Sequence, residues 1–338
     1  MIISFNWAVF NTEDANIQKL LAKILIYLAE EDHPTHILDE TICPIFFDAD
    51  DHWSLEQSSI QGYLSSHDIK SLKEYMSRPK PVTFLQKTYF RSITIGLDDS
   101  QGEISPDIAY KIIIERSLLF LENRVTDGSY IKEICKKYSY HHTRKGIYQL
   151  IERAITEVRL DLRNSGGVTA MPSQITAEIN SSPYESIYRY KIMALLDGDQ
   201  EYQEGSIKLN RRTEDSRCKI ENLGIVWYQL HKRTIENYVP IDQILRIPNI
   251  EQDVRTAIGK MTPNDLDYYK YNDKPPTKAQ VLNVFLEPFS YDKIEARCSH
   301  HRQSYSPPWF NTPPIEISEI PIEISEIEVI LLKIAQIL

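Results

Sequence analysis

Three acidic residues stand where a carboxylate could hold a metal ion. Glu122 follows the apolar run 117–121, and Asp197 and Asp199 follow the apolar run 192–196. Short apolar runs of this kind are typical of buried strands, and ligands of open α/β sheets bind at the carboxyl ends of the strands. Carboxylates that meet at one sheet edge repel one another unless a cation neutralises them, and their hard oxygens suit Mg²⁺ or Mn²⁺. The sequence therefore predicts an acidic metal centre.

The Asp-Gly-Asp sequence at 197–199 also has an ordinary explanation, since Asp and Gly are common in turns. If the segment is extended, Asp197 and Asp199 point the same way, and Gly198 between them permits a tight turn. A calcium-binding EF-hand loop is excluded, because Tyr202 and Lys208 occupy the positions that require Gly and Glu. The prediction of a metal centre therefore depends on Glu122 lying beside this pair.

The elements that must position these residues alternate between helices and strands in the range 105–313. Helices are expected at 106–116, 126–138 and 143–156, and strands at 117–122, 191–196 and 224–229. This alternation predicts an α/β fold, with a parallel or mixed sheet flanked by helices. Residues 1–104 are expected to form an additional α/β region, with helices at 12–31 and from 66 or 67 to 78, and one or two strands in 83–97.

The segment 314–338 differs from the rest of the chain. Its PIEISEI sequence occurs twice in succession, from Pro314 and from Pro321, and an apolar stretch follows. One interpretation is an acidic tail that ends in a short amphipathic helix. The other is an element for self-association or partner docking, because alternating Ile and Glu also suits an added strand.

The charge distribution permits a polyanionic partner. The net charge is −10, but 15 acidic and 8 basic residues lie in 1–100, and 5 acidic and 1 basic in 314–338. The range 101–313 is close to neutral, with basic runs at 132–145 and 208–219. DNA or RNA can therefore be a substrate there, although binding to phosphates needs Lys and Arg.

Other features of the sequence favour a cytoplasmic protein. The chain has no run of about 18 apolar residues, so no membrane-spanning helix is expected. Its four cysteines are scattered without a Cys-x-x-Cys pair, which indicates reduced thiols. Only Cys298 with His300 and His301 approaches a zinc-binding cluster, and no second ligand pair accompanies them.

Three segments together resemble the TOPRIM domain. They are Glu122-Asn-Arg-Val-Thr-Asp127, Asp197-Gly-Asp199 and Lys232-Arg-Thr-Ile-Glu236-Asn-Tyr, and the likeness covers roughly residues 115–245. The version in OLD-family and related stand-alone phage-defence nucleases is the most similar. The resemblance implies a Mg²⁺- or Mn²⁺-dependent nuclease that acts on DNA or RNA in antiviral defence.

The resemblance also implies a role for each matching residue. Glu122 would be a metal ligand or general base. Asp127, Asp197 and Asp199 would also bind the metal ion, and Glu236 would support the site. Either Lys232 or Lys270 would be the cation that faces the scissile phosphate.

The sequence departs from the family pattern in two places. Asn123 follows Glu122 where the family has Gly, and Asp127 lies five residues after Glu122 instead of four. No GxxxxGK[ST] phosphate loop is present, so an ATPase or sensor function would come from a separate subunit. Two alternatives remain open. Glu236 could simply pair with Lys232 one helical turn earlier, and the whole chain could be a non-catalytic scaffold that docks partners.

Overall fold

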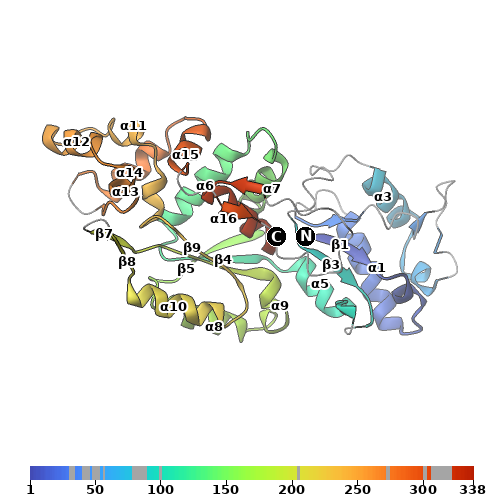
Figure 1. The fold of residues 1–338 in the computed structure, drawn as a ribbon. Coiled ribbons are helices and arrows are strands. Elements are labelled where there is room, and N and C mark those ends of the chain that lie inside the picture. Colours follow the sequence, from blue (N-terminus) through green and yellow to red (C-terminus); the bar gives the residue numbers. More distant parts are fainter. Residues whose placement is uncertain are drawn as a thin grey trace.

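Four parallel strands form the sheet that carries the three acidic residues (Figure 1). In this computed structural model the strands are β4 (Ser117–Leu121), β5 (Leu160–Asn164), β6 (Ile192–Leu196) and β9 (Val226–Gln229), in the order β5-β4-β6-β9. Strands β4 and β6 are buried along their whole length, which explains why they are continuous apolar runs. The predicted α/β fold with a helix-flanked sheet is confirmed, and its paired strands are all parallel.

The structure describes most of the chain. The described residues are 1–29, 35–39, 46–47, 54–55, 58–77, 90–98, 101–203, 206–271, 275–299, 303–305 and 322–338. The first copy of the PIEISEI repeat, 314–320, and both His300 and His301 lie outside these residues. Of the predicted strand region 83–97, residues 83–89 also lie outside them, and the remainder contains strand β3 (Ser92–Ile95).

Strand β5 is the one strand of this sheet that the sequence did not predict. The strand ends just before Gly166 and Gly167, which both have a positive φ. The strand lies at the sheet edge, where buried Leu160 and Leu162 alternate with the half-buried Asp161 and Arg163. This mixture of charged and apolar residues lacks the continuous apolar run that identified β4 and β6.

Helices cover both faces of the sheet, so side chains that alternate along a strand enter different cores. Leu119 and Leu121 pack into the core under one helix layer, and Leu118 and Phe120 into the core under the other. The first layer contains α6 (Thr126–Tyr138), α7 (Lys145–Thr156) and α16 (Glu326–Ile337). The second contains α5 (Pro106–Ile114), α8 (Met171–Ile179), α9 (Tyr184–Lys191) and α10 (Arg211–Glu221).

Short helices follow β9 and pack against the end of the sheet domain. They are η5 (Ile235–Tyr238), α11 (Ile241–Ile244), α12 (Gln252–Gly259), α13 (Pro263–Asp267), α14 (Lys278–Phe285) and α15 (Asp292–Arg297). Two small antiparallel pairs complete the domain, β7 (Glu201–Gln203) with β8 (Ser206–Lys208) and β10 (Gln303–Tyr305) with β11 (Ile322–Ile324).

The N-terminal region has its own three-stranded parallel sheet. Its strands are β1 (Ile2–Phe5), β2 (Ile37–Leu38) and β3 (Ser92–Ile95), in the order β2-β1-β3. The helical segments around it are η1 (Trp7–Asn11), α1 (Ala15–Ala29), η3 (Ser59–Tyr63) and α3 (Ser66–Ser77). Its apolar side chains are continuous with the core that contains α5, α8 and α9. The N-terminal region is therefore packed against the larger sheet domain.

The C-terminal helix α16 is part of the core. Eleven of its twelve residues are buried, whereas an amphipathic helix on a tail would expose one face. Its buried acids have partners: Glu328 accepts hydrogen bonds from Arg144 Nε at 2.8 Å and the Tyr148 hydroxyl at 2.7 Å, and Glu326 accepts one from the backbone N–H of His231. The chain ends also meet, since the Met1 amino group donates to the Leu338 carbonyl at 2.8 Å.

None of the described helices is long and apolar enough to cross a membrane. The cysteines Cys135, Cys218 and Cys298 are free thiols. Cys135 and Cys298 are buried in the core, and this burial raises the pKa of both thiols. Cys298 is therefore a neutral packing residue in this structure.

Candidate active site

A cavity of about 420 Å³ opens at the carboxyl ends of β5, β4 and β6. Each strand contributes one polar residue: Asn164 ends β5, Glu122 follows β4 and Asp197 follows β6. Strand β5, which follows β4 in the chain, pairs with one side of β4, and the later strand β6 pairs with the other side of β4. The cavity thus lies where the strand order reverses direction, which is the usual ligand position in open α/β sheets.

The loop and first turn after β4 place Asp127 in the same cavity. Its carboxylate accepts hydrogen bonds from the backbone N–H of Asn123 at 2.8 Å and from the Thr126 hydroxyl at 3.1 Å. Glu122 is held in a similar way, because its Oε1 accepts the backbone N–H of Asp197 at 3.2 Å. The spacing of five residues between Glu122 and Asp127 therefore still brings both into one site.

The carboxylates of this site destabilise one another's charged forms. Burial, and then the charge of Asp199, raises the pKa of Glu122 to about 7. Burial and the charge of Glu122 raise the pKa of Asp197 well above its ordinary value. The pKa of Asp127 is raised by burial and by the charge of Glu236. Burial is the largest cause of each shift, and neighbouring carboxylates add to it, so the metal-free site disfavours the charged forms of all three groups.

Among the described residues that line the cavity, Lys278 is the only cationic one. It is the first residue of α14, and its ammonium lies 3.2 Å from Oε1 of Glu236. Glu236 is fully buried in η5, and no hydrogen bond of good geometry reaches either of its carboxylate oxygens from the described residues. Burial lowers the pKa of Lys278, but the charges of Glu236 and Asp197 raise it by more than burial lowers it. The net pKa is above its ordinary value, so the ammonium stays charged.

Asp199 does not line the cavity. Its φ of 50° is left-handed, so the segment is not extended and the prediction that Asp197 and Asp199 point the same way is wrong. The Asp199 carboxylate instead accepts a hydrogen bond from the Thr213 hydroxyl at 2.9 Å. Its charge still acts on Glu122, so Asp199 belongs to the surroundings of the site.

Gly198 is required by close packing of the backbone. A Cβ at this position would lie 2.2 Å from the carbonyl oxygen of Lys232 and 2.5 Å from that of Leu230. Both contacts are with main-chain atoms, which a side-chain rotation cannot relieve. The glycine therefore allows the loop after β6 to pass against the segment after β9, and this contact fixes the position of Asp197.

The two cations predicted to face the phosphate do not line the cavity. Lys232 is fully buried, forms an ion pair with Asp267, and donates a hydrogen bond to the Arg297 carbonyl at 2.9 Å. Lys270 is exposed on the surface. The alternative pairing of Glu236 with Lys232 is also wrong, because Lys278 pairs with Glu236.

The donor groups of the cavity fit a hard divalent cation in chemical type. They are the carboxylates of Glu122, Asp127 and Asp197 and the amide of Asn164, all of which offer oxygen. In the side-chain positions of this structure, no three His, Cys, Asp or Glu side chains among the described residues are arranged to hold a metal ion. The fit therefore concerns the donor chemistry and the unneutralised charge of the site.

Comparison with known proteins gives no relative: no family model, curated protein or solved structure matches this chain. The similarity to TOPRIM domains therefore rests on the residues themselves. Of these residues, Glu122, Asp127 and Asp197 are brought together in one cavity, with Glu236 next to it through Lys278.

Proposed function

We propose that this protein is a TOPRIM-type nuclease that cleaves nucleic-acid phosphodiesters with Mg²⁺ or Mn²⁺. The observation that supports the proposal is the cavity at the switch point of the sheet. It gathers Glu122, Asp127 and Asp197, whose pKa values are all raised, around a single lysine. A site that holds unneutralised carboxylates is costly to fold, which makes a cationic ligand the simplest reason for it.

In this proposal Glu122, Asp127 and Asp197 hold the cation. Such an ion supplies Lewis-acid stabilisation of the phosphate oxygens and lowers the pKa of bound water. Without a metal, burial and the charge of Asp199 raise the pKa of Glu122 to about 7. A bound cation would stabilise the charged carboxylate and lower this pKa, so the shift is consistent with Glu122 as a ligand of the ion.

Lys278 has a separate role in the proposal. Its ammonium faces the cavity and counters the negative charge that develops on the phosphate as the diester is attacked. Glu236 positions Lys278 through their ion pair. We also propose, from the resemblance alone, that the enzyme acts in antiviral defence together with a separate ATPase or sensor subunit.

The proposal is tested by incubating the purified chain with plasmid, linear DNA and tRNA. We expect cleavage of at least one of these in Mg²⁺ or Mn²⁺ and none in EDTA. We also expect cleavage to be lost in Asp197→Asn, whose shape matches that of the parent residue. Equal cleavage by wild type and Asp197→Asn would discard the site. Absence of cleavage by the folded wild type with every substrate and metal would favour the non-catalytic scaffold.

A further inference from the structure

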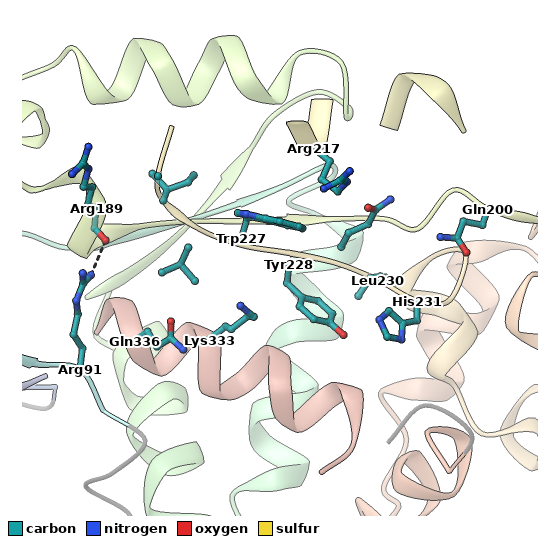
Figure 2. A pocket seen from close by; sticks show the side chains of 14 residues that line it. Arg91, Arg189, Gln200, Arg217, Trp227, Tyr228, Leu230, His231, Lys333 and Gln336 are labelled. Carbon is teal, nitrogen blue, oxygen red and sulfur yellow. Dashed lines mark hydrogen bonds between the residues drawn. The ribbon is translucent and has the colours of Figure 1, made fainter. Parts of the chain in front are cut away.

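A second, larger hollow of about 670 Å³ follows the exposed edge of the sheet along β9 (Figure 2). We call it the β9 groove, and its lining includes residues from Gly224 to His231. Among the strands of the described residues, β9 pairs only with β6, and residues of β9 line the groove. The four residues of β9 cover about 13 Å of extended chain, and the lining continues beyond both ends of the strand.

The β9 groove is basic in a protein whose net charge is −10. Its cationic lining residues come from four different elements or loops: Arg91 before β3, Arg189 on α9, Arg217 on α10 and Lys333 on α16. None of the described residues that line it is acidic. Figure 2 shows these cations around Trp227 and Tyr228, with Arg91 and Arg189 at one end and Gln200 and His231 at the other.

Two of these cations lack an ionic partner. Neither Arg91 nor Lys333 forms an ion pair with a carboxylate in the part of the chain that the structure describes; Arg91 donates to the Arg189 carbonyl at 2.7 Å and lies 4.1 Å from the Tyr190 ring centroid. Burial lowers the pKa of both side chains, and no carboxylate opposes that shift. Unpaired cations that are partly removed from water are costly, so an anionic ligand would stabilise this region.

The groove also contains a flat stacking surface. Trp227 packs against one core but is only partly buried and lines the groove, whereas Tyr228 is buried in the other core. The Arg217 guanidinium lies 5.7 Å from the Trp227 ring centroid. Nucleobases stack on aromatic rings and on arginine planes, and they are free to do so in single strands.

The groove ends close to the acidic cavity. Gln200 at one end of the groove follows directly on the loop of Asp197 to Asp199, whose first residue lines the cavity. We infer that the β9 groove binds a single strand of nucleic acid, with phosphates on Arg91, Arg189 and Lys333 and a base near Trp227, and so presents the strand to the acidic cavity. The direction of the strand toward the cavity rests on the proposed nuclease function, whereas the binding itself does not.

The inference is tested by fluorescence anisotropy in EDTA, so that binding is measured without cleavage. Labelled (dT)12, (rU)12 and a 12-base-pair duplex are titrated with the full chain at low salt. We expect the wild type to bind at least one single strand more tightly than the duplex. The variants Arg189→Gln and Lys333→Gln should each weaken binding about tenfold and reduce the salt slope by about 0.7, the value for one lost phosphate contact.

Two further variants separate the groove from general effects. Trp227→Leu should weaken binding about tenfold through lost stacking. Lys260→Gln removes an exposed cation outside the groove and should bind as the wild type does. Arg189 is exposed, so its variant tests the groove even if Lys333→Gln disturbs the buried helix α16.

The inference would be overturned if the folded wild type bound neither single strand. It would also be overturned if the variants Arg189→Gln and Trp227→Leu bound a single strand as tightly as the wild type does. It would also be overturned if a polyglutamate peptide bound in preference to both oligonucleotides, since this would indicate an acidic protein strand as the occupant. Cleavage of bis(4-nitrophenyl) phosphate, too small to need the groove, is measured alongside. Wild type that binds (dT)12 but cleaves nothing contradicts only the proposed function; cleavage of the small diester without binding contradicts only the groove.

Discussion

Glu122→Gln is expected to lower metal-dependent cleavage of bis(4-nitrophenyl) phosphate by at least about 10²-fold, the effect of removing one essential charge-stabilising group. The amide has nearly the shape of the carboxylate but lacks the negative charge that would hold a divalent cation. The same substitution should raise the free energy of unfolding in EDTA at pH 8, because it removes a negative charge that burial and Asp199 disfavour. Initial rates in Mn²⁺ and urea unfolding measure the two effects.

Glu185→Gln is the matched control for this variant. Glu185 is an exposed carboxylate on α9 that does not line the cavity, so its loss should leave both the rate and the free energy of unfolding nearly unchanged. An inactive Glu122→Gln that is also less stable than wild type would indicate that Glu122 is a structural residue. Loss of activity together with a gain of stability is the pattern of a functional site that costs stability.

The stability of the metal-free protein should decrease as the pH rises through 7. An unfolded Glu122 has its ordinary pKa near 4.5, while the folded protein holds it at about 7. Between these values the folded state binds more protons than the unfolded state, so the free energy of unfolding falls with increasing pH. For Glu122 alone the loss is about 3 kcal/mol between pH 4.5 and pH 8. The raised pKa values of Asp127 and Asp197 act in the same direction.

Groups whose pKa is lowered oppose this trend, so the measurement must compare variants. Burial lowers the pKa of His141 to about 4, that of Lys191 to about 7 and that of the Met1 amino group well below its ordinary value, and a lowered pKa makes the free energy of unfolding rise with pH over the shifted range. All of these groups are present in Glu122→Gln as well. The difference in free energy of unfolding between wild type and Glu122→Gln, followed by urea unfolding from pH 5 to pH 8, therefore isolates the carboxylate. A pH-independent difference would contradict the account.

Mn²⁺ should restore the folding stability that the protein loses as the pH rises. A ligand that binds only the folded state at 100 times its Kd stabilises by about 2.7 kcal/mol. At pH 8 the wild type should gain stability with Mn²⁺ concentration, and Glu122→Gln should gain much less. An equal gain in both proteins would place the binding ion outside the cavity.

The sequence was sufficient to predict the strands that carry the acidic residues. Strands β4 and β6 are buried on both faces, so their sequences are uninterrupted apolar runs, and a carboxylate directly after such a run must lie at the sheet edge. Asp127 could be predicted too, since it comes five residues after Glu122 in the first turn of α6. These features are local in the chain, which is why pattern alone identified them.

The cation of the site could not be predicted in this way. Lys278 comes from a helix more than 80 residues after Asp197, and nothing near it in the sequence refers to the sheet. Its only local signal is the capping box formed by Thr277 and Gln280, which marks the start of the helix that carries Lys278 as its first residue. Lys232 lies within the segment that resembles the TOPRIM motif. Its partner Asp267, however, comes from a distant helix, so the burial of Lys232 could not be predicted from the spacing of nearby residues.

The buried helix α16 shows a similar limit. Its Glu residues suggested a solvent-exposed face, but Arg144 and Tyr148 on α7 satisfy Glu328 inside the core. Acidic residues in a helix indicate solvent exposure only when no partner from another element pairs with them. Contacts between distant segments decided both this burial and the position of Lys278.

The measurement that tests the central claim most directly is an anomalous difference map at the manganese edge, from crystals of the wild-type chain grown at pH 8 with Mn²⁺. We expect a peak in the cavity, within coordination distance of the carboxylate oxygens of Glu122 and Asp197, and no such peak in crystals of Glu122→Gln. A cavity without manganese in fully soaked wild-type crystals, or manganese bound only elsewhere on the protein, would contradict the claim that these carboxylates form a metal centre.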